Sequence, residues 1–295
     1  MAVLSSLVSC RQEELNPTSI ITADVKEKNA FDLWLDANYV NPYNIEVKYR
    51  YEMNESDFSY YTIPAREDCS IVLAHLVKYL CIDTYDEVAG RAFTRRYFPK
   101  MFFYLGEWEY KNNGSFILGT AEGGKKIFLT GVNFIFDVLA GTYKGHTDPR
   151  EAVNYYYVKT IHHEFTHILN QTKDFPADFS QVTPSAYVND SWNTTEFEKG
   201  YLGRGFISAY AQDSDREDFA ETMALFVTHD QEWWDARMEE AGTTGSSLIT
   251  AKLDIVKSYM KTSFDIDLEE IRASVLRRQE DVVNGEVDLT SLEIL

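Results

Sequence analysis

Two histidines one helical turn apart, with a glutamate beside the first, are the residues best suited to chemistry in this chain. They lie in the stretch His162-His163-Glu164-Phe165-Thr166-His167. Residues four apart share a helix face, so His163 and His167 can hold one metal ion, whereas His162 is about 140° away from His167. Glu164 lies about 100° around the helix from His163, where its carboxylate can reach a metal-bound water. The pattern predicts a Zn²⁺ site that lowers the pKa of this water toward ~7, with Glu164 as the base.

A catalytic zinc site of this kind usually needs a third protein ligand. The metzincin pattern requires Gly at position 170 and His or Asp at position 173, and Asn170 and Lys173 exclude it. A second helix offers the stretch Arg216-Glu217-Asp218-Phe219-Ala220-Glu221. We predict Glu217 as the third ligand, with Glu221 one turn later accepting the free ring N–H of a ligand histidine. Glu221 or Asp218 as the ligand, and a merely solvated acidic helix face, are the alternatives.

The predicted motif helix has a well-defined start. In Asp148-Pro149-Arg150-Glu151, Asp caps free amides, Pro fits the first turn and Glu suits a capping box. The helix should end near residue 171, because Pro176 follows. Residues 174–205 resemble a loop, and residues 215–229, 247–261 and 267–283 have helical patterns.

The N-terminal half predicts two helices, 65–82 and 84–97, followed by strands. Met101 to Tyr110 is an apolar run, Asn112-Asn113-Gly114 is a turn signal, and Phe116 to Leu118 is the return strand. With Ile127 to Leu129, this predicts an antiparallel sheet of three or more strands, then a short helix or strand at 132–140. Strand 125–130 is predicted as an edge that could bind an extended peptide.

Composition indicates a folded, acidic chain of 295 residues. It is 44% hydrophobic, and its net charge of -19 would repel a nucleic-acid backbone. No stretch reaches the ~18 consecutive apolar residues of a membrane span. Cys69 and Cys81 lie in a predicted helix, ~18 Å apart, so they should not form a disulfide.

The N-terminus resembles a bacterial lipoprotein signal. Leu7-Val8-Ser9-Cys10 follows an apolar run and matches a lipobox, in which Cys10 would be lipid-modified. The run lacks a preceding Lys or Arg and is shorter than the usual ~15–30 residues, so an incidental cysteine is the alternative. We expect a signal at 1–10, a tether at 11–28, an α+β hydrolase fold at 29–285 divided near residue 145, and a tail at 286–295.

The two motif helices together resemble the gluzincin site of anthrax lethal factor-type metallopeptidases. The resemblance implies a zincin-like fold with a C-terminal helical region and one Zn²⁺. It also implies that Tyr210, seven residues before Glu217, stabilises an oxyanion. With Cys10, the chain resembles the substrate import-associated zinc metallohydrolase lipoproteins. These are outer-membrane lipoproteins found beside TonB-dependent importers, on a periplasmic or surface face.

The sequence therefore predicts a zinc metallopeptidase that cleaves peptide or protein substrates by a Glu-activated water. Two other classes remain open. One is a surface lipoprotein that binds a nutrient or partner and keeps zinc for structure. The other is an interaction module without metal, in which the motif arose by chance.

Overall fold

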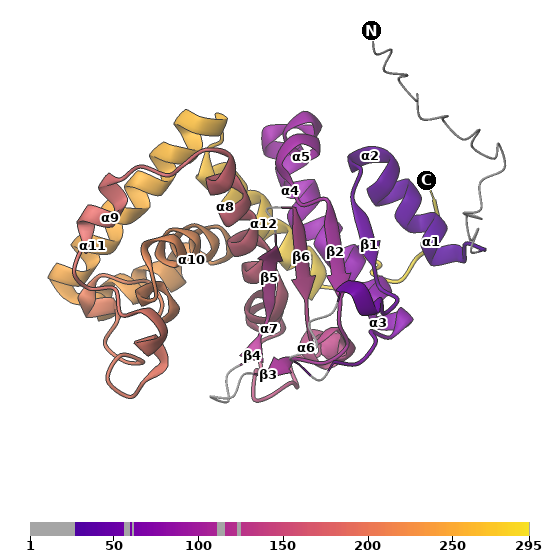
Figure 1. Cartoon of the computed structure of the whole chain (residues 1–295), viewed down its shortest axis with the longest axis horizontal. Coiled ribbons are helices and arrows are strands. Elements are labelled where there is room, and N and C mark those ends of the chain that lie inside the picture. The colour runs from indigo at the N-terminus through magenta and orange to yellow at the C-terminus, as the bar shows by residue number, and fades with distance from the viewer. Residues whose placement is uncertain (1–26, 56–59, 61, 111–115, 123–124, 295) are drawn as a thin grey trace, which may run out of the picture.

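A mixed four-stranded sheet lies at the centre of the molecule (Figure 1). The computed structural model describes residues 27–55, 60, 62–110, 116–122 and 125–294. The sheet order is β1 (Glu46–Lys48), β2 (Met101–Tyr104), β6 (Lys126–Leu129), β5 (Gly119–Glu122). The first three strands are parallel, and β5 is antiparallel to β6. A separate antiparallel pair is formed by β3 (Glu109–Tyr110) and β4 (Phe116–Ile117).

Three strand predictions are wrong. The run Met101 to Tyr110 is two short strands, β2 and β3, and the main sheet is mixed instead of antiparallel. Strand β6, within the predicted edge 125–130, pairs on both sides, and β5 is the edge strand beside it. Parallel pairing joins strands far apart in the chain, which local alternation and turn signals cannot show. The turn Asn112-Asn113-Gly114 lies outside the described residues.

Long continuous helices contain single turns of π-helix. The segment η1 (Asp36–Val40) joins α1 (Ala30–Leu35) to α2 (Asn41–Tyr43). Likewise η3 (Val77–Ile82) joins α3 (Glu67–Leu76) to α4 (Asp83–Ala89), and α5 (Arg91–Tyr97) follows Gly90. The predicted break near residue 83 is therefore wrong, and the chain turns at Gly90. Helix α1 was not predicted; Asn29 and Asp32 form its capping box.

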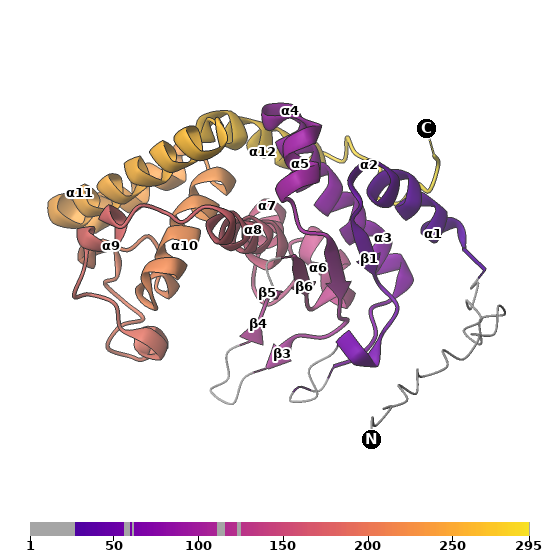
Figure 2. The same ribbon diagram turned by 45° about the horizontal axis from the view of Figure 1, so that its top comes forward.

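Most of the remaining helices lie on the β5 side of the sheet (Figures 1 and 2). They are α6 (Ile135–Leu139), α7 (Pro149–Val153), η5 (Asn154–Val158), α8 (Lys159–Thr172), α9 (Asp178–Val182), α10 (Asp215–Thr228), α11 (Gln231–Phe264) and α12 (Leu268–Val283). The short 3₁₀ segments are η2 (Met53–Glu55), η4 (Val132–Phe134), η6 (Asn189–Asn193), η7 (Leu202–Arg204) and η8 (Tyr210–Gln212). Helix α11 begins sixteen residues before the predicted 247 and bends at Gly242, whose φ is 65°.

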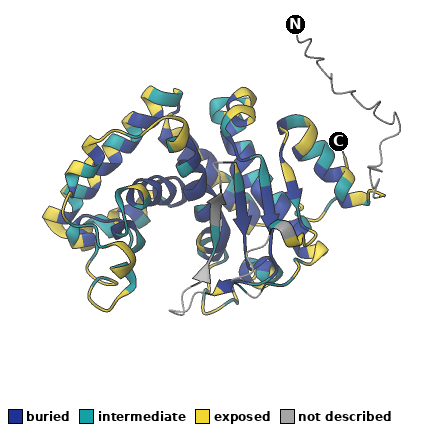
Figure 3. Ribbon diagram, in the orientation of Figure 1, coloured by how far each residue is buried: buried dark blue, intermediate teal, exposed yellow. Residues whose placement is uncertain are grey.

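The main apolar core joins the sheet to these helices, and Phe103, Leu105 and Phe128 form a second, smaller buried cluster. Figure 3 shows β2 and β6 as buried strands. Cys69 and Cys81 are both buried and free, which confirms that they do not pair. No helix in the described part of the chain is both long and apolar enough to cross a bilayer. The predicted α+β class is confirmed.

The edge strand β5 lies directly against α8. A Cβ added to Gly119 would lie 2.7 Å from the backbone oxygen of Phe128 and 2.8 Å from Cγ2 of Thr160. Only glycine allows this approach of strand to helix. The sheet edge is thereby placed beside the helix that carries the histidine motif.

Candidate metal centre

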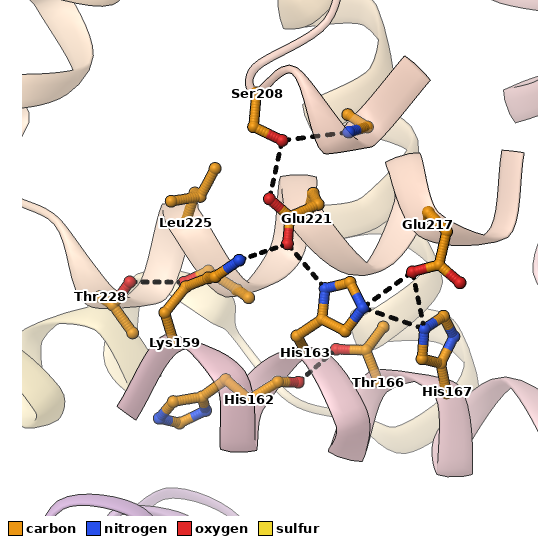
Figure 4. A network of polar contacts seen from close by, with 12 residues as sticks. Lys159, His162, His163, Thr166, His167, Ser208, Glu217, Glu221, Leu225 and Thr228 are labelled. Carbon is orange, nitrogen blue, oxygen red and sulfur yellow. Dashed lines mark hydrogen bonds and ion pairs between the residues drawn. The ribbon is translucent and has the colours of Figure 1, made fainter. Parts of the chain in front are cut away.

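Helix α8 presents the histidine motif on the end of a continuous helical stretch that starts at α7. The Asp148 side chain caps this stretch by accepting a hydrogen bond from the backbone N–H of Arg150. His163 and His167 face the same side, whereas His162 points away into the core (Figure 4). Its ring lies 3.1 Å from the hydroxyl of Tyr85, and burial lowers the pKa of His162 to about 3. His162 therefore cannot share a metal ion with its two neighbours.

Helix α10 brings Glu217 to the two histidines. Its N-terminus is capped by Ser214, which accepts from the backbone N–H of Glu217. Nε2 of His163 lies 3.1 Å from Nε2 of His167 and 2.9 Å from Oε2 of Glu217. The same Oε2 of Glu217 lies 3.3 Å from Nε2 of His167. Ligand atoms around a tetrahedral Zn²⁺ with bonds of ~2.0–2.1 Å are about 3.3 Å apart. The three side chains thus fit one zinc ion (Figure 4).

Glu221 lies one turn beyond Glu217 and faces the other nitrogen of His163. Its Oε1 is 2.8 Å from Nδ1 of His163 and 2.6 Å from Nζ of Lys159, and its Oε2 accepts from Ser208 at 2.7 Å. These contacts hold Glu221 with its carboxylate turned toward the far side of the ring. This is the geometry expected for a residue that orients a ligand histidine.

Asp218 points away from this centre. It is fully buried and pairs at 2.6 Å with Lys252, which is also buried and donates to the backbone oxygen of Gly205. The hydroxyl of Tyr187 donates to the same Asp218 oxygen. Asp218 therefore ties α10 to α11 and to the loop before α10, and it is not positioned to bind the ion.

Charges in the centre are strongly coupled. Burial lowers the pKa of His163, but contacts with Glu217 and Glu221 outweigh it and raise the pKa to about 9. Burial would raise the pKa of Glu217, yet the two histidines hold it well below its ordinary value. For Glu221, burial is likewise outweighed by Lys159 and His163, which lower its pKa. Both carboxylates are ionised at neutral pH.

Zinc binding at pH 7 is expected to release about one proton, because His163 must lose its proton to become a ligand. Protonated His163 stabilises the zinc-free fold fully below the ordinary pKa of ~6.5, and this contribution is lost as pH rises through about 9. Apparent zinc affinity should therefore rise roughly tenfold per pH unit from pH 7 to about 9. Calorimetric titration in two buffers of different ionisation enthalpy measures the release; identical heats would contradict it.

The metal centre opens into a cavity of about 830 Å³. Glu164 and Tyr210 both line it, and the ring centroids of Tyr210 and His163 are 5.9 Å apart. Burial and the nearby Glu217 raise the pKa of Tyr210 well above its usual value, so it remains a hydroxyl donor. Trp192 and Trp233 also line the cavity, whereas Trp234 is buried. His146 and His229 line it as well.

Sequence reasoning missed Lys159 and Ser208. Lys159 precedes His163 by four residues, so helical spacing was a usable signal for its place on the same face. Ser208 comes from the irregular segment before α10, where spacing gives no such signal. Both side chains contact Glu221.

The mixed sheet with an antiparallel edge strand beside the motif helix, and a second helix supplying a carboxylate, define a zincin-like α+β fold. A family model described as "Putative zinc-binding metallo-peptidase" matches residues 24–269. A crystal structure with the same description, from Bacteroides caccae, is 37% identical over 93% of this chain and 100% of that chain, with a TM-score of 0.74. No curated protein matches the sequence. The chain belongs to this family of zinc-binding metallopeptidases.

Proposed function

We propose that the protein is a gluzincin-type peptidase in which His163, His167 and Glu217 hold a single Zn²⁺. The observation that carries the proposal is the convergence of these three side chains on the wall of a large cavity that Glu164 also lines. When bound, zinc polarises the scissile carbonyl and lowers the pKa of water.

Glu164 is the proposed proton carrier. It takes a proton from the attacking water and delivers it to the leaving amine. It follows His163 on α8 and is only 9% exposed, so its carboxylate works in a partly desolvated wall of the cavity. Glu221, held by Lys159 and Ser208, is proposed to fix the ring orientation of His163.

The proposed substrate is a peptide bound in extended form along β5. In the described sheet β5 pairs with β6 alone, and Leu118 and Gly119 at its start line the cavity. A peptide backbone that pairs with this edge would pass over the metal centre. This role belongs to β5 because β6 has neighbours on both sides.

Tyr210→Phe should lower kcat by roughly 10²-fold, because removing one oxyanion donor costs about 10²–10³. The phenyl ring of the variant should keep the contact that Tyr210 makes with Trp192, so binding should change less than turnover. Steady-state kinetics of the zinc-loaded variant measures both parameters. An unchanged kcat would remove Tyr210 from the mechanism.

The proposal is tested by the metal content and activity of protein purified without added metal. We expect about one zinc per chain by mass spectrometry and cleavage of a broad peptide library, lost on chelation and restored by Zn²⁺. Zinc without turnover would favour a binding lipoprotein with a structural metal. Near-zero affinity for zinc would favour an interaction module.

We also propose an outer-membrane lipoprotein that serves nutrient uptake beside a TonB-dependent importer. The support is the lipobox-like segment ending in Cys10, which lies outside the described residues, and the family resemblance. Membrane contact would be through the lipid alone, and the net charge of -19 argues against nucleic-acid partners. Palmitate labelling of wild type and Cys10→Ser in a Gram-negative host tests the anchor. Co-purification with an importer tests the partner.

A further inference from the structure

The cavity continues beyond the metal centre along a groove between two antiparallel helical stretches. Lys159 meets Glu221, the side chain of Asn154 donates to the backbone oxygen of Thr228, and Glu151 meets His229. Figure 4 shows α8 and α10 side by side, with their chains running in opposite directions. Residues from both stretches line the same cavity, and the first turns of α11 add Trp233 and Arg237 at its far end.

The groove is long enough for several residues of substrate. Glu221, whose carboxylate faces His163, lies eight positions before His229, the residue that follows α10, which corresponds to ~12 Å of helix. An extended chain covers this distance with about three to four residues. A peptide cleaved at the metal centre can therefore place a group against Trp233 and Arg237 a few residues from the scissile bond.

Among the described Lys and Arg side chains that line the cavity, Arg237 is the one whose charge pair leaves it open to a ligand. Lys159 is paired with Glu221, and His229 Nε2 lies 3.6 Å from the carboxylate of Glu151. Arg237 instead contacts Glu240, whose side chain is 64% exposed. Such an exposed pair is worth little and is readily exchanged for another carboxylate.

Aromatic rings support this arginine. The Arg237 guanidinium lies 5.2 Å from the centre of the Trp233 ring, which in turn packs against His229 with ring centroids 4.1 Å apart and planes tilted by 32°. Tyr155, 47% exposed, also lines the groove. A planar guanidinium held over an indole is preorganised to bind a carboxylate through two parallel hydrogen bonds.

We propose that this groove is a specificity subsite for peptides bearing a carboxylate a few residues from the scissile bond, with Arg237 as its anchor and Trp233 as its apolar platform. The inference rests on the proposed peptidase function and names its substrate class. The carboxylate can be the C-terminus of a short peptide or an acidic side chain within a longer one, and both present the same chemistry to Arg237.

The test compares two matched libraries of N-acetylated random hexapeptides, one with free C-terminal carboxylates and one amidated. Products are identified by mass spectrometry with wild type, Arg237→Gln and Arg66→Gln, the last removing an exposed arginine that does not line the cavity. We expect carboxylate-bearing peptides to be preferred roughly tenfold in kcat/KM by wild type and Arg66→Gln. Arg237→Gln should reduce the preference to about one.

The two carboxylate sources give different signatures. A preference for free acids over amides indicates the C-terminus. An excess of Glu over Gln at one position of cleaved amidated peptides indicates an acidic side chain. Either preference supports the proposal if Arg237→Gln abolishes it, and no preference, or one that survives Arg237→Gln, overturns it.

A binding measurement separates failure of the subsite from failure of the peptidase proposal. Three dansyl-labelled pools are titrated with zinc-loaded Glu164→Gln protein, with and without Arg237→Gln, and followed by anisotropy: free-acid peptides, amidated peptides, and amidated peptides in which Asn and Gln replace Asp and Glu. A roughly tenfold preference for either carboxylate-bearing pool over the pool without carboxylates supports the subsite if it depends on Arg237, even if wild type cleaves nothing. Equal binding of all three pools, or no binding of any, overturns it.

Discussion

Glu164→Gln is expected to lower kcat/KM on a peptide substrate by about 10²–10⁴-fold, the range supplied by a positioned general base. Glutamine has the same size and keeps the hydrogen-bonding oxygen, but it cannot take a proton. Because Glu164 is not among the three side chains that converge on one point, zinc content should stay at the wild-type level. Activity on a library-derived peptide and zinc by mass spectrometry are measured on the same preparation.

The matched control is Glu270→Gln, which removes an exposed carboxylate from α12 far along the chain from the motif. It should retain wild-type activity. Loss of zinc in Glu164→Gln would mean that the glutamate supports the metal instead of the proton transfer. A loss in kcat/KM below about tenfold, with zinc retained, would require another base.

Local signals predicted the elements that carry the motif. Asp148, predicted as a cap, begins α7 because a short side-chain acceptor can meet free backbone amides at a helix start. Ser214, which was not predicted, caps α10 in the same way. The apolar residues of α8 are buried where this helix packs against α10 and β5. Capping residues and apolar spacing are local features that span one or two helical turns, so they can be recognised in the sequence without knowledge of the fold.

Long-range pairing was not readable in this way. Strand β2 pairs with β1 and β6 in parallel, and each partner lies more than twenty residues away. The edge strand of the sheet is therefore β5 and not β6. Gly119 of β5 permits close contact with Thr160 of α8. A glycine in a strand marks a possible close approach, but not its partner.

The acidic helix α10 is a second case in which the sequence alone could not assign the role of each residue. Glu217, Asp218 and Glu221 are all within one turn or so, and spacing alone left each open as a ligand. Packing separates them: Lys252 on α11 draws Asp218 away, and Lys159 on α8 occupies one side of Glu221. Both lysines come from other helices, so their effect depends on tertiary structure.

Glu217→Ala and Glu221→Ala should separate a metal ligand from a residue that orients one. Zinc affinities of about 10–16 kcal/mol shared among four ligands correspond to ~3–4 kcal/mol each, so Glu217→Ala should weaken zinc binding by roughly 10²–10³-fold. Glu221→Ala should weaken it by about 10–100-fold, the usual effect of losing a histidine partner. Competition with a chromogenic chelator at pH 7.5 measures both affinities.

Circular dichroism of each zinc-free variant must show a folded helical protein, because Glu221 is buried and its removal leaves Lys159 without its partner. Lys159→Met combined with Glu221→Ala removes that unpaired charge and should restore part of the folding stability without restoring zinc affinity. If Glu221→Ala abolishes zinc binding while Glu217→Ala retains it, the two glutamates exchange roles. In that case His163 would have to turn its Nδ1, which faces Glu221 at 2.8 Å, toward the ion.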